Sequence, residues 1–134
     1  MATTAELVAR LYIAYFNRAP DPIGLQHWVD DLNGGASLLD AANNFAGSTE
    51  AKATYPYLLA PSLLNAEDFI NQVYQNVLAR AADADGLKYY SDMLKAGVSA
   101  GAVVLDILNN AVKFTPGGGD IFISAEKSGH MAVI

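Results

Sequence analysis

Apolar residues recur along the chain at helical spacing, and the same pattern occurs twice. In the first copy they step as i, i+1, i+4, i+5, i+8 and i+9, which is the wide stripe of a helix that faces a core. The steps return 62 positions later, the spacing that also separates Arg18 from Arg80. The sequence therefore predicts a tandem duplication. The matched pairs are Leu7 with Phe69, Val8 with Ile70, Leu11 with Val73, Tyr12 with Tyr74, Tyr15 with Val77 and Phe16 with Leu78.

A second helix is expected in each copy, after a corner that contains Asp and Gly. The first corner reads NRAPDPIGLQHW and the second reads ARAADADGLKYY. We expect Arg18 and Arg80 to close the preceding helices, where a cation complements the helix dipole. Asp21 and Asp83 are expected to cap the following helices, because an N-cap carboxylate accepts hydrogen bonds from free backbone N–H groups. Pro22 then occupies the first helical position, which tolerates proline best.

Glycine occurs in the first turn of both second helices, as Gly24 and Gly86, at a cost of about 1 kcal/mol relative to alanine. Its presence in both copies indicates that another backbone, that of the preceding helix, comes close. A third helix follows. Asn109 resembles Asn43 at a spacing of 66, so the second copy is expected to have gained about one helical turn. The core positions expected on the third helices are Leu38, Leu39, Ala42 and Phe45 in the first copy, and Val104, Ile107, Leu108 and Ala111 in the second.

The pattern as a whole predicts an all-α fold, in which a three-helix unit made twice forms one compact bundle. The repeats are expected at about residues 5–50 and 66–113, within a single domain spanning residues 1–116. Residues 117–134 are interpreted as a glycine-rich linker and a short apolar tail, irregular or extended. Because chain ends are seldom so apolar unless they pack, this tail is expected to dock on the helices or to pair with another copy.

The segment between the repeats carries breaks and a new start. Pro56 and Pro61 should interrupt any long helix there, because proline lacks the N–H that a helix interior needs. Asn65 followed by Asp68, just before an apolar run, resembles the beginning of a helix.

Composition narrows the classes of partner. The 134-residue chain has a formal charge of −6 with scattered basic residues, which disfavours nucleic acid and anionic membrane surfaces. No apolar run approaches the roughly 20 residues that span a bilayer. The chain has no cysteine, so disulfides and thiolate metal sites are excluded. Its start shows no basic segment leading an apolar one, so we expect no cleaved N-terminal signal peptide.

The stretch LYIAYFNRAPDPIGLQHWVDDLNGG, with the later Ser48-Thr49-Glu50, resembles the DUF4214 domain. The pattern of that family runs Leu-Tyr, Arg-x-Pro-Asp, Gly-Leu, Tyr-Trp, a glycine after the second helix and then Ser-x-Glu. His27 stands before Trp28 where the family has tyrosine. The second copy departs further, since it has Ala82 for the proline and Tyr90 for the tryptophan, and lacks Ser-x-Glu. The resemblance extends from Ala5 to Val112.

The resemblance implies an all-helical, non-catalytic module of large bacterial extracellular proteins. Such domains accompany calcium-binding RTX repeats and type I secretion. The start MATTAELV, followed by helical units, is also similar to the N-terminal region of S-layer proteins that hold lipopolysaccharide. These similarities favour anchoring at the bacterial cell surface, on envelope polysaccharide or lipopolysaccharide, with bridging calcium as one means. The alternative is a structural domain for self-assembly or contact with sister domains.

A calcium site is one candidate for chemistry in the second corner. Asp83 and Asp85 with Gly86 resemble the centre of a calcium loop, which would place Asp92 at the twelfth position. The loop lacks a carboxylate at its first position and a glutamate at its last. Helix capping and dipole complementation explain the same aspartates without a metal, and no other cofactor is expected.

Polar ligand contacts are a second candidate. Arg18 and Arg80 have planar donor forks that suit a phosphate or a sugar carboxylate, and Gln26 and His27 are the other candidates for ligand binding. The structural alternative pairs Arg18 with Asp21 or Asp30, and Arg80 with Asp83 or Asp92. Structural roles are also assigned to Asp21, Gly24, Trp28, Asp83 and Gly86.

For the aromatic residues and for His27, interpretations without a ligand are favoured. The helical spacing of Tyr12, Tyr15 and Trp28 favours core packing over stacking on sugar rings, and His27 is expected to face outward. The sequence shows no recognisable catalytic set, so we predict that the protein is not an enzyme.

Overall fold

The chain folds into helices throughout the part that the computed structural model describes, residues 3–114, with side chains described as far as Ala111. No strand occurs within these residues, and the predicted all-α class is confirmed. The expected linker and tail, 117–134, lie outside the described residues. The helices are α1 (Thr4–Phe16), α2 (Pro22–Asn33), α3 (Leu38–Ala46), α4 (Thr49–Thr54), α5 (Pro56–Leu59), α6 (Leu63–Leu78), α7 (Ala84–Lys95) and α8 (Ala100–Phe114).

Most of the helices, but not α5 and α7, begin at residues whose side chains satisfy free N–H groups. Thr3 and Glu6 form a capping box at the start of α1, and Ser37 and Asp40 form another at α3. The expected start of α6 at Asn65 is wrong. Ser62 caps that helix three residues earlier, and its Oγ accepts a hydrogen bond from the Asn65 N–H at 3.1 Å.

Pro56 and Pro61 interrupt the middle of the chain as predicted, because no helix runs across either of them. Tyr55 is extended and separates α4 from α5, and Pro56 occupies the first turn of α5. These two short helices were not expected from the sequence.

The duplication is visible in the backbone. The residues that end α1 and α6, Asn17 and Ala79, both adopt the left-handed conformation, with φ of 52° and 57°. Ala79 lacks a polar side chain to offset this conformation, so its recurrence at the same offset shows that the corner geometry is retained. Gly35 and Gly97, before the third helices, also share a positive φ of 113° and 95°.

The expected drift in register to 66 is wrong. Ser37 Oγ accepts from Asp40 N at 3.0 Å, and Ser99 Oγ accepts from Ala102 N at 3.2 Å, so both third helices begin at the offset of 62. The extra length of α8 lies at its C-terminal end, past the point where Gly47 ends α3.

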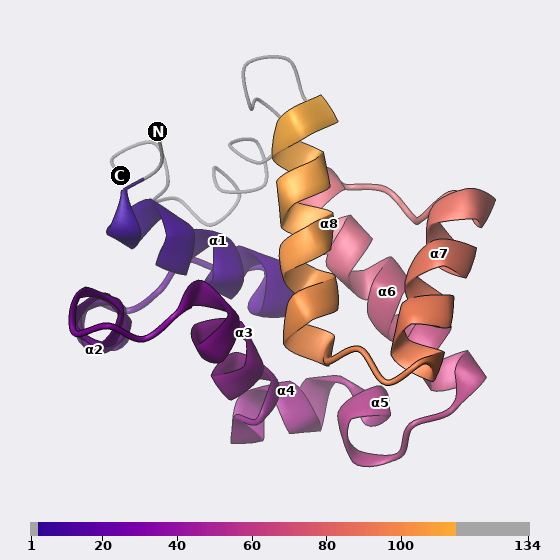
Figure 1. Ribbon diagram of the computed structural model, residues 1–134, viewed down its shortest axis with the longest axis horizontal. Helices are drawn as coiled ribbons and strands as arrows, with labels where there is room; N and C mark the ends of the chain where they lie inside the picture. The colour runs from indigo at the N-terminus through magenta and orange to yellow at the C-terminus, as the bar shows by residue number, and fades with distance from the viewer. Residues whose placement is uncertain (1–2, 115–134) are drawn as a thin grey trace.

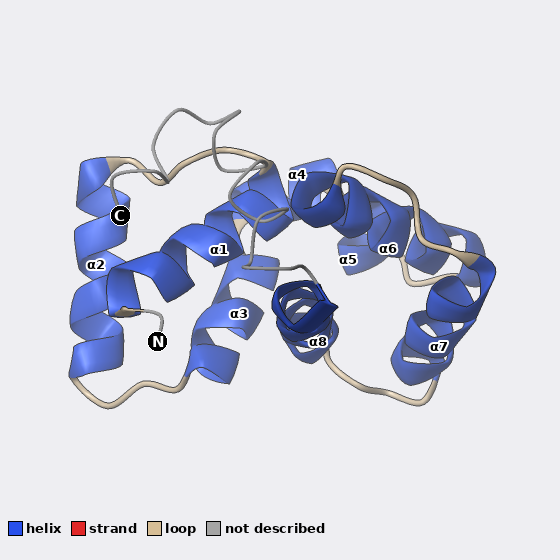
Figure 2. Cartoon of the chain, turned by 90° about the horizontal axis from the view of Figure 1, so that it is seen from above, coloured by secondary structure: helices blue, strands red, loops and turns tan. Residues whose placement is uncertain are grey.

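The two repeats pack by pairing equivalent helices. In Figure 1, α1 to α3 lie on one side, α6 and α7 lie on the other, and α8 crosses the front between them. The view from above shows α2 and α7 at opposite ends of the molecule (Figure 2). The largest contacts between the repeats join α3 to α8 and α1 to α6. The core is therefore shared between the repeats.

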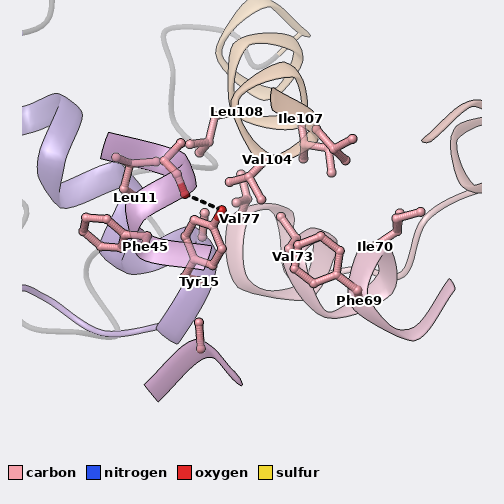
Figure 3. Packing of buried hydrophobic residues seen from close by; sticks show 14 of the residues in the cluster. Leu11, Tyr15, Phe45, Phe69, Ile70, Val73, Val77, Val104, Ile107 and Leu108 are labelled. Carbon is pink, nitrogen blue, oxygen red and sulfur yellow. Dashed lines mark hydrogen bonds between the residues drawn. The ribbon is translucent and has the colours of Figure 1, made fainter. Parts of the chain in front are cut away.

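The core contains the apolar stripes that the sequence predicts. Tyr15 and Phe69 are among its largest fully buried side chains, and Figure 3 shows Tyr15 beside Val77 of the second repeat. Tyr15 also donates its hydroxyl to the Ala42 carbonyl oxygen at 2.8 Å. The expected core role of Leu39 is wrong, because this side chain is 43% exposed; Ala41 fills that role on α3.

Polar groups also join the repeats. The Asn76 side chain donates to the Ala14 carbonyl oxygen at 2.8 Å and to the Tyr55 hydroxyl at 3.3 Å. The Tyr55 hydroxyl in turn donates to the carbonyl oxygen of Tyr15, in the last turn of α1. One hydroxyl therefore connects the last turn of α1 with the last turn of α6.

The closest approach between backbones occurs where α8 crosses α3. Gly101 N donates to Asn43 Oδ1 at 3.0 Å. A Cβ on Gly101 would lie 2.6 Å from Asn43 N and 2.8 Å from the Ala42 carbonyl carbon, closer than packed atoms come. This crossing requires glycine.

Along residues 3–114, none of the helices combines the length and the apolar character that crossing a membrane requires.

Candidate functional site

Each repeat holds a pocket at its corner between the first two helices, and the walls of the two pockets are equivalent. We call them the first and second corner pockets; their volumes are about 240 Å³ and 350 Å³. The wall residues that correspond at the offset of 62 are Tyr12 and Tyr74, Phe16 and Leu78, Arg18 and Arg80, Asp21 and Asp83, Trp28 and Tyr90, Phe45 and Ile107, and Ser48 and Asn110.

The corners are built around a tyrosine that lies against the glycine of the second helix. A Cβ on Gly24 would come within 2.5 Å of the Tyr12 hydroxyl oxygen, and one on Gly86 within 2.6 Å of the Tyr74 hydroxyl oxygen. A group of the preceding helix does come close to these glycines, but the expectation that this group is the backbone is wrong. A tyrosine side chain of the preceding helix makes the approach, and glycine leaves the space that its hydroxyl occupies.

The aspartates of the two corners differ in their bonds. Asp21 caps α2 and its Oδ2 accepts from Gly24 N at 2.9 Å, as predicted. Asp83 occupies the N-cap position of α7 but its side chain makes no capping hydrogen bond, so that part of the prediction is wrong. Burial, and then the nearby Asp83 carboxylate, raise the pKa of Tyr74, while Arg80 opposes the shift.

An ion pair lies in the wall of the first corner pocket. Arg18 Nη2 lies 2.8 Å from Glu50 Oε1, and Arg18 Nε donates to Glu50 Oε2 at 3.3 Å. The guanidinium carbon lies 5.1 Å from the centre of the Tyr12 ring. The hydrogen bond to Glu50 raises the pKa of Arg18. The expected partners, Asp21 and Asp30, are therefore wrong.

Ser48 explains how Glu50 reaches this arginine. The chain turns at Gly47, and Ser48 caps α4 by accepting from Ala51 N at 3.1 Å. Glu50 then lies in the first turn of α4, facing Arg18 from a distance of 32 residues in the sequence. The Ser-x-Glu pattern thus has a structural role, which cannot be seen by comparing the sequences of the two repeats.

The second corner pocket lacks such an ion pair among the described side chains. Arg80 repeats the pose of Arg18, with its guanidinium carbon 5.6 Å from the centre of the Tyr74 ring and its Nη1 donating to Ala81 O at 3.4 Å. Among residues 3–111, however, no carboxylate forms an ion pair with it. The expected pairing with Asp83 or Asp92 is wrong, because the Asp92 Oδ2 instead lies 2.8 Å from Lys88 Nζ. Helix α8 continues where the first repeat turns into α4.

The walls of the second corner pocket are also smaller. Trp28 packs on Phe45 with ring centres 4.7 Å apart, whereas Tyr90 and Ile107 stand at the equivalent positions. Asn110 Nδ2 donates to the Tyr90 hydroxyl at 2.8 Å and fixes its position. Burial, and then a hydrogen bond with Asp106, raise the pKa of Tyr90.

Tyr89 lies at the rim of the second corner pocket and is 56% exposed. Its ring meets that of Tyr90 edge to face, with centres 5.0 Å apart. Sequence reasoning missed Tyr89 and Asn110, although Tyr89 stands at the position of His27 in the first copy, where the family pattern has tyrosine.

Gln26 and His27, the other two candidates for ligand binding, do not line either corner pocket. Gln26 donates to Asp30 Oδ1 at 2.7 Å, and His27 Nε2 lies 3.5 Å from Asp31 Oδ2, both on the exposed side of α2. His27 faces outward as predicted. Tyr12 and Tyr15 are buried and Trp28 packs on the core, which confirms their core role.

The calcium candidates are not gathered into a site. Asp83 and Asp85 both line the second corner pocket, but Asp92 is directed to Lys88. Within the described part of the chain, no three histidine or acidic side chains are grouped so that they could hold a metal ion.

Comparison with known proteins yields one match. The family described as a domain of unknown function (DUF4214) matches residues 2–55 and 62–111, which are the two repeats. Neither a curated protein nor a solved structure matches the chain. The family match covers most of the sequence, and it includes both of the corners described above. The chain therefore belongs to the DUF4214 family.

Proposed function

We propose that the protein is a non-catalytic binding module that attaches a secreted bacterial protein to envelope polysaccharide or lipopolysaccharide. The observation that carries the proposal is the difference between the corner pockets. In the first, of about 240 Å³, the chain's own Glu50 binds the arginine, while the second, of about 350 Å³, leaves Arg80 without an acidic partner among the described residues. Such a volume lies in the range of small-ligand sites.

The wall of the second corner pocket has the composition of a binding site for a polar ligand. It combines the donor Arg80 with the acceptors Asp83 and Asp85 and the exposed ring of Tyr89. A few polar groups set among aromatic rings fix the orientation of a bound molecule. The extracellular setting and the contribution of bridging calcium rest on the family resemblance and are part of the proposal.

A retention experiment tests this function. The purified chain is passed over immobilised envelope polysaccharide and lipopolysaccharide of Gram-negative bacteria, with and without calcium. We expect retention, and we expect Arg80→Gln to reduce it. Arg18→Gln is the matched control, because Arg18 lies over a tyrosine ring in the same way in the first corner pocket. If nothing is retained in either condition, the proposal fails.

A structural role in self-assembly is the second candidate. Three exposed leucines around the start of α6 favour it, since Leu59, Leu63 and Leu64 are 68%, 64% and 68% exposed. Exposed apolar side chains close together mark contact surfaces on many proteins. Light scattering after size-exclusion chromatography, on the full chain and on a chain without residues 117–134, tests it. A monomer at high concentration in both cases excludes this role.

A further inference from the structure

The charges around the second corner pocket differ from those around the first, and the difference bears on the ligand. The inference rests on the proposed function and narrows the class of sugar. At the offset of 62, Asp85 replaces Ile23 and Asp106 replaces Asn44, while Glu50 has no acidic counterpart. The second corner therefore loses the carboxylate that binds its arginine and gains two that do not.

These charges disfavour an anionic ligand. Asp83 and Asp85 line the pocket, and Asp106 lies behind its wall, where it bonds to Asn110 Nδ2 at 3.3 Å. Among the described residues of the lining, Arg80 is the one cationic side chain. A carboxylate or phosphate that approached Arg80 would meet the repulsion of these acids, and like charges brought together in a binding site cost affinity.

A hydroxyl group satisfies both kinds of side chain. Arg80 only donates hydrogen bonds, and the ionised carboxylates of Asp83 and Asp85 only accept them. A hydroxyl both donates and accepts, so a ligand with adjacent hydroxyls can bridge the arginine and an aspartate without adding charge. Hydrogen bonds to charged groups are the stronger kind.

The ring of Tyr89 supplies the apolar part of the site. It is 56% exposed at the rim, and its edge-to-face contact with Tyr90 holds it in place. The face of an aromatic ring carries negative potential and therefore attracts the polarised C–H groups on one face of a pyranose. His27 stands at the same position in the first repeat, with a smaller ring and an ion pair to Asp31.

We infer that the second corner pocket binds an uncharged pyranose, which stacks on Tyr89 and whose adjacent hydroxyls bond to Arg80 and to Asp83 or Asp85. Uronic acids and phosphorylated sugars are excluded by the acidic surroundings. In an envelope polysaccharide the module thus reads a neutral sugar of the chain rather than its charged groups.

Binding of matched sugars to the full chain tests the inference. The probes are the methyl glycosides of glucose, galactose and mannose, together with those of glucuronic and galacturonic acid, titrated by ligand-observed NMR at low and high salt. We expect at least one neutral sugar to bind roughly tenfold more tightly than any uronate. We also expect added salt to narrow that ratio, because it screens the repulsion.

Variants locate the binding. Tyr89→Ala should weaken the neutral sugar about tenfold, and His27→Ala, the matched change in the first repeat, should leave it unchanged. Asp85→Asn should raise the relative affinity for the uronate, an effect on selectivity that a loss of stability would not produce. Circular dichroism shows whether each variant remains folded.

The outcomes separate this inference from the function on which it rests. A uronate that binds as tightly as the neutral sugars, with sensitivity to Arg80→Gln, overturns the inference and leaves the binding function standing. Neutral binding that is equally weakened by His27→Ala and Tyr89→Ala also overturns it. If no sugar binds and no polysaccharide is retained, both fail.

Discussion

The two corners share one arrangement of backbone and key residues, and they differ in the side chains that pack around it. Both have a tyrosine against a glycine, an arginine stacked on that tyrosine, and an aspartate at the start of the next helix. In the first corner Glu50 forms an ion pair with the arginine. Two large rings, those of Trp28 and Phe45, pack against each other there. In the second, Tyr90 and Ile107 stand in place of these rings, and the pocket is larger, at about 350 Å³ against about 240 Å³. The comparison teaches that the corner keeps its geometry without the ion pair and without the two large rings.

The difference also separates stability from binding. The Arg18 and Glu50 side chains are 42% and 46% exposed, so their ion pair contributes modestly to stability. Its larger effect is to hold α4 beside the first corner. In the second corner, no ion pair with Arg80 occurs among residues 3–111.

The largest expected effect concerns the crossing that joins the repeats. Gly101→Ala should lower the free energy of unfolding by about 3 kcal/mol, because the new methyl group meets the backbone of Ala42 and Asn43. Urea unfolding measures the change. Gly47→Ala is the control, since a Cβ there would lie 3.6 Å from its nearest neighbour; it should change stability by less than about 0.5 kcal/mol. Equal effects of the two variants would contradict the crossing.

The next effect concerns the link between α1 and the second repeat. Tyr55→Phe should cost about 1.5 kcal/mol, because the carbonyl oxygen of Tyr15 loses a buried donor. Burial raises the pKa of both Tyr15 and Tyr55 above the ordinary value of about 10. Their contribution to stability is thus complete below pH 10 and is lost as the pH rises further.

The same variant should therefore respond less to alkali. Between pH 10 and 11 the free energy of unfolding should fall by about 1 kcal/mol more in the wild type than in Tyr55→Phe, because the tyrosine of the unfolded chain, with a pKa of about 10, is on average about three quarters ionised over this interval. Urea unfolding at several pH values gives the slopes. Parallel slopes would show that the Tyr55 hydroxyl is not protected in the folded protein.

A third change makes the second corner resemble the first. Ile107→Phe places in the second corner pocket the side chain that Phe45 provides in the first. We expect it to narrow the pocket and to weaken sugar binding about tenfold, or about 1.4 kcal/mol. Titration with the best neutral sugar measures the loss, and Ile107→Leu, which keeps the volume, is the control. Unchanged binding by Ile107→Phe would place the ligand elsewhere.

The smallest effect makes the first corner resemble the second. Glu50→Gln should lower stability by about 0.5 kcal/mol, because it removes a half-exposed ion pair. The loss should shrink as salt is added. Thermal unfolding of the variant and of Glu67→Gln, for which no ion pair is present among residues 3–111, gives the comparison. A salt-independent loss would show that packing of Glu50, and not its charge, is important.

The sequence carried the repeat and most of the local structure. Apolar spacing and corner residues are local signals, so helix positions and the caps of α1 and α3 could be understood from neighbouring residues. The register of α8 was misjudged because Asn43 and Asn109 are similar by chance, while the caps Ser37 and Ser99 retain the offset of 62.

The candidate site was predicted only in part. Arg18 and Arg80 were identified, but their partners depend on contacts between distant segments. Glu50 reaches Arg18 across 32 residues only because α4 turns back at Gly47. The larger volume of the second corner pocket follows from several wall side chains that are each slightly smaller than their counterparts. No single position in the sequence indicates this larger volume.

Pairing of equivalent helices across the two repeats has a consequence for how the chain can be divided. A cut between α5 and α6 would produce two pieces, each with one side of the common core facing water. We therefore expect that neither half folds alone, although each corresponds to one matched segment of the family. The halves should instead recover their structure by complementation when mixed, and the minimal unit that can be transplanted into another protein is the pair.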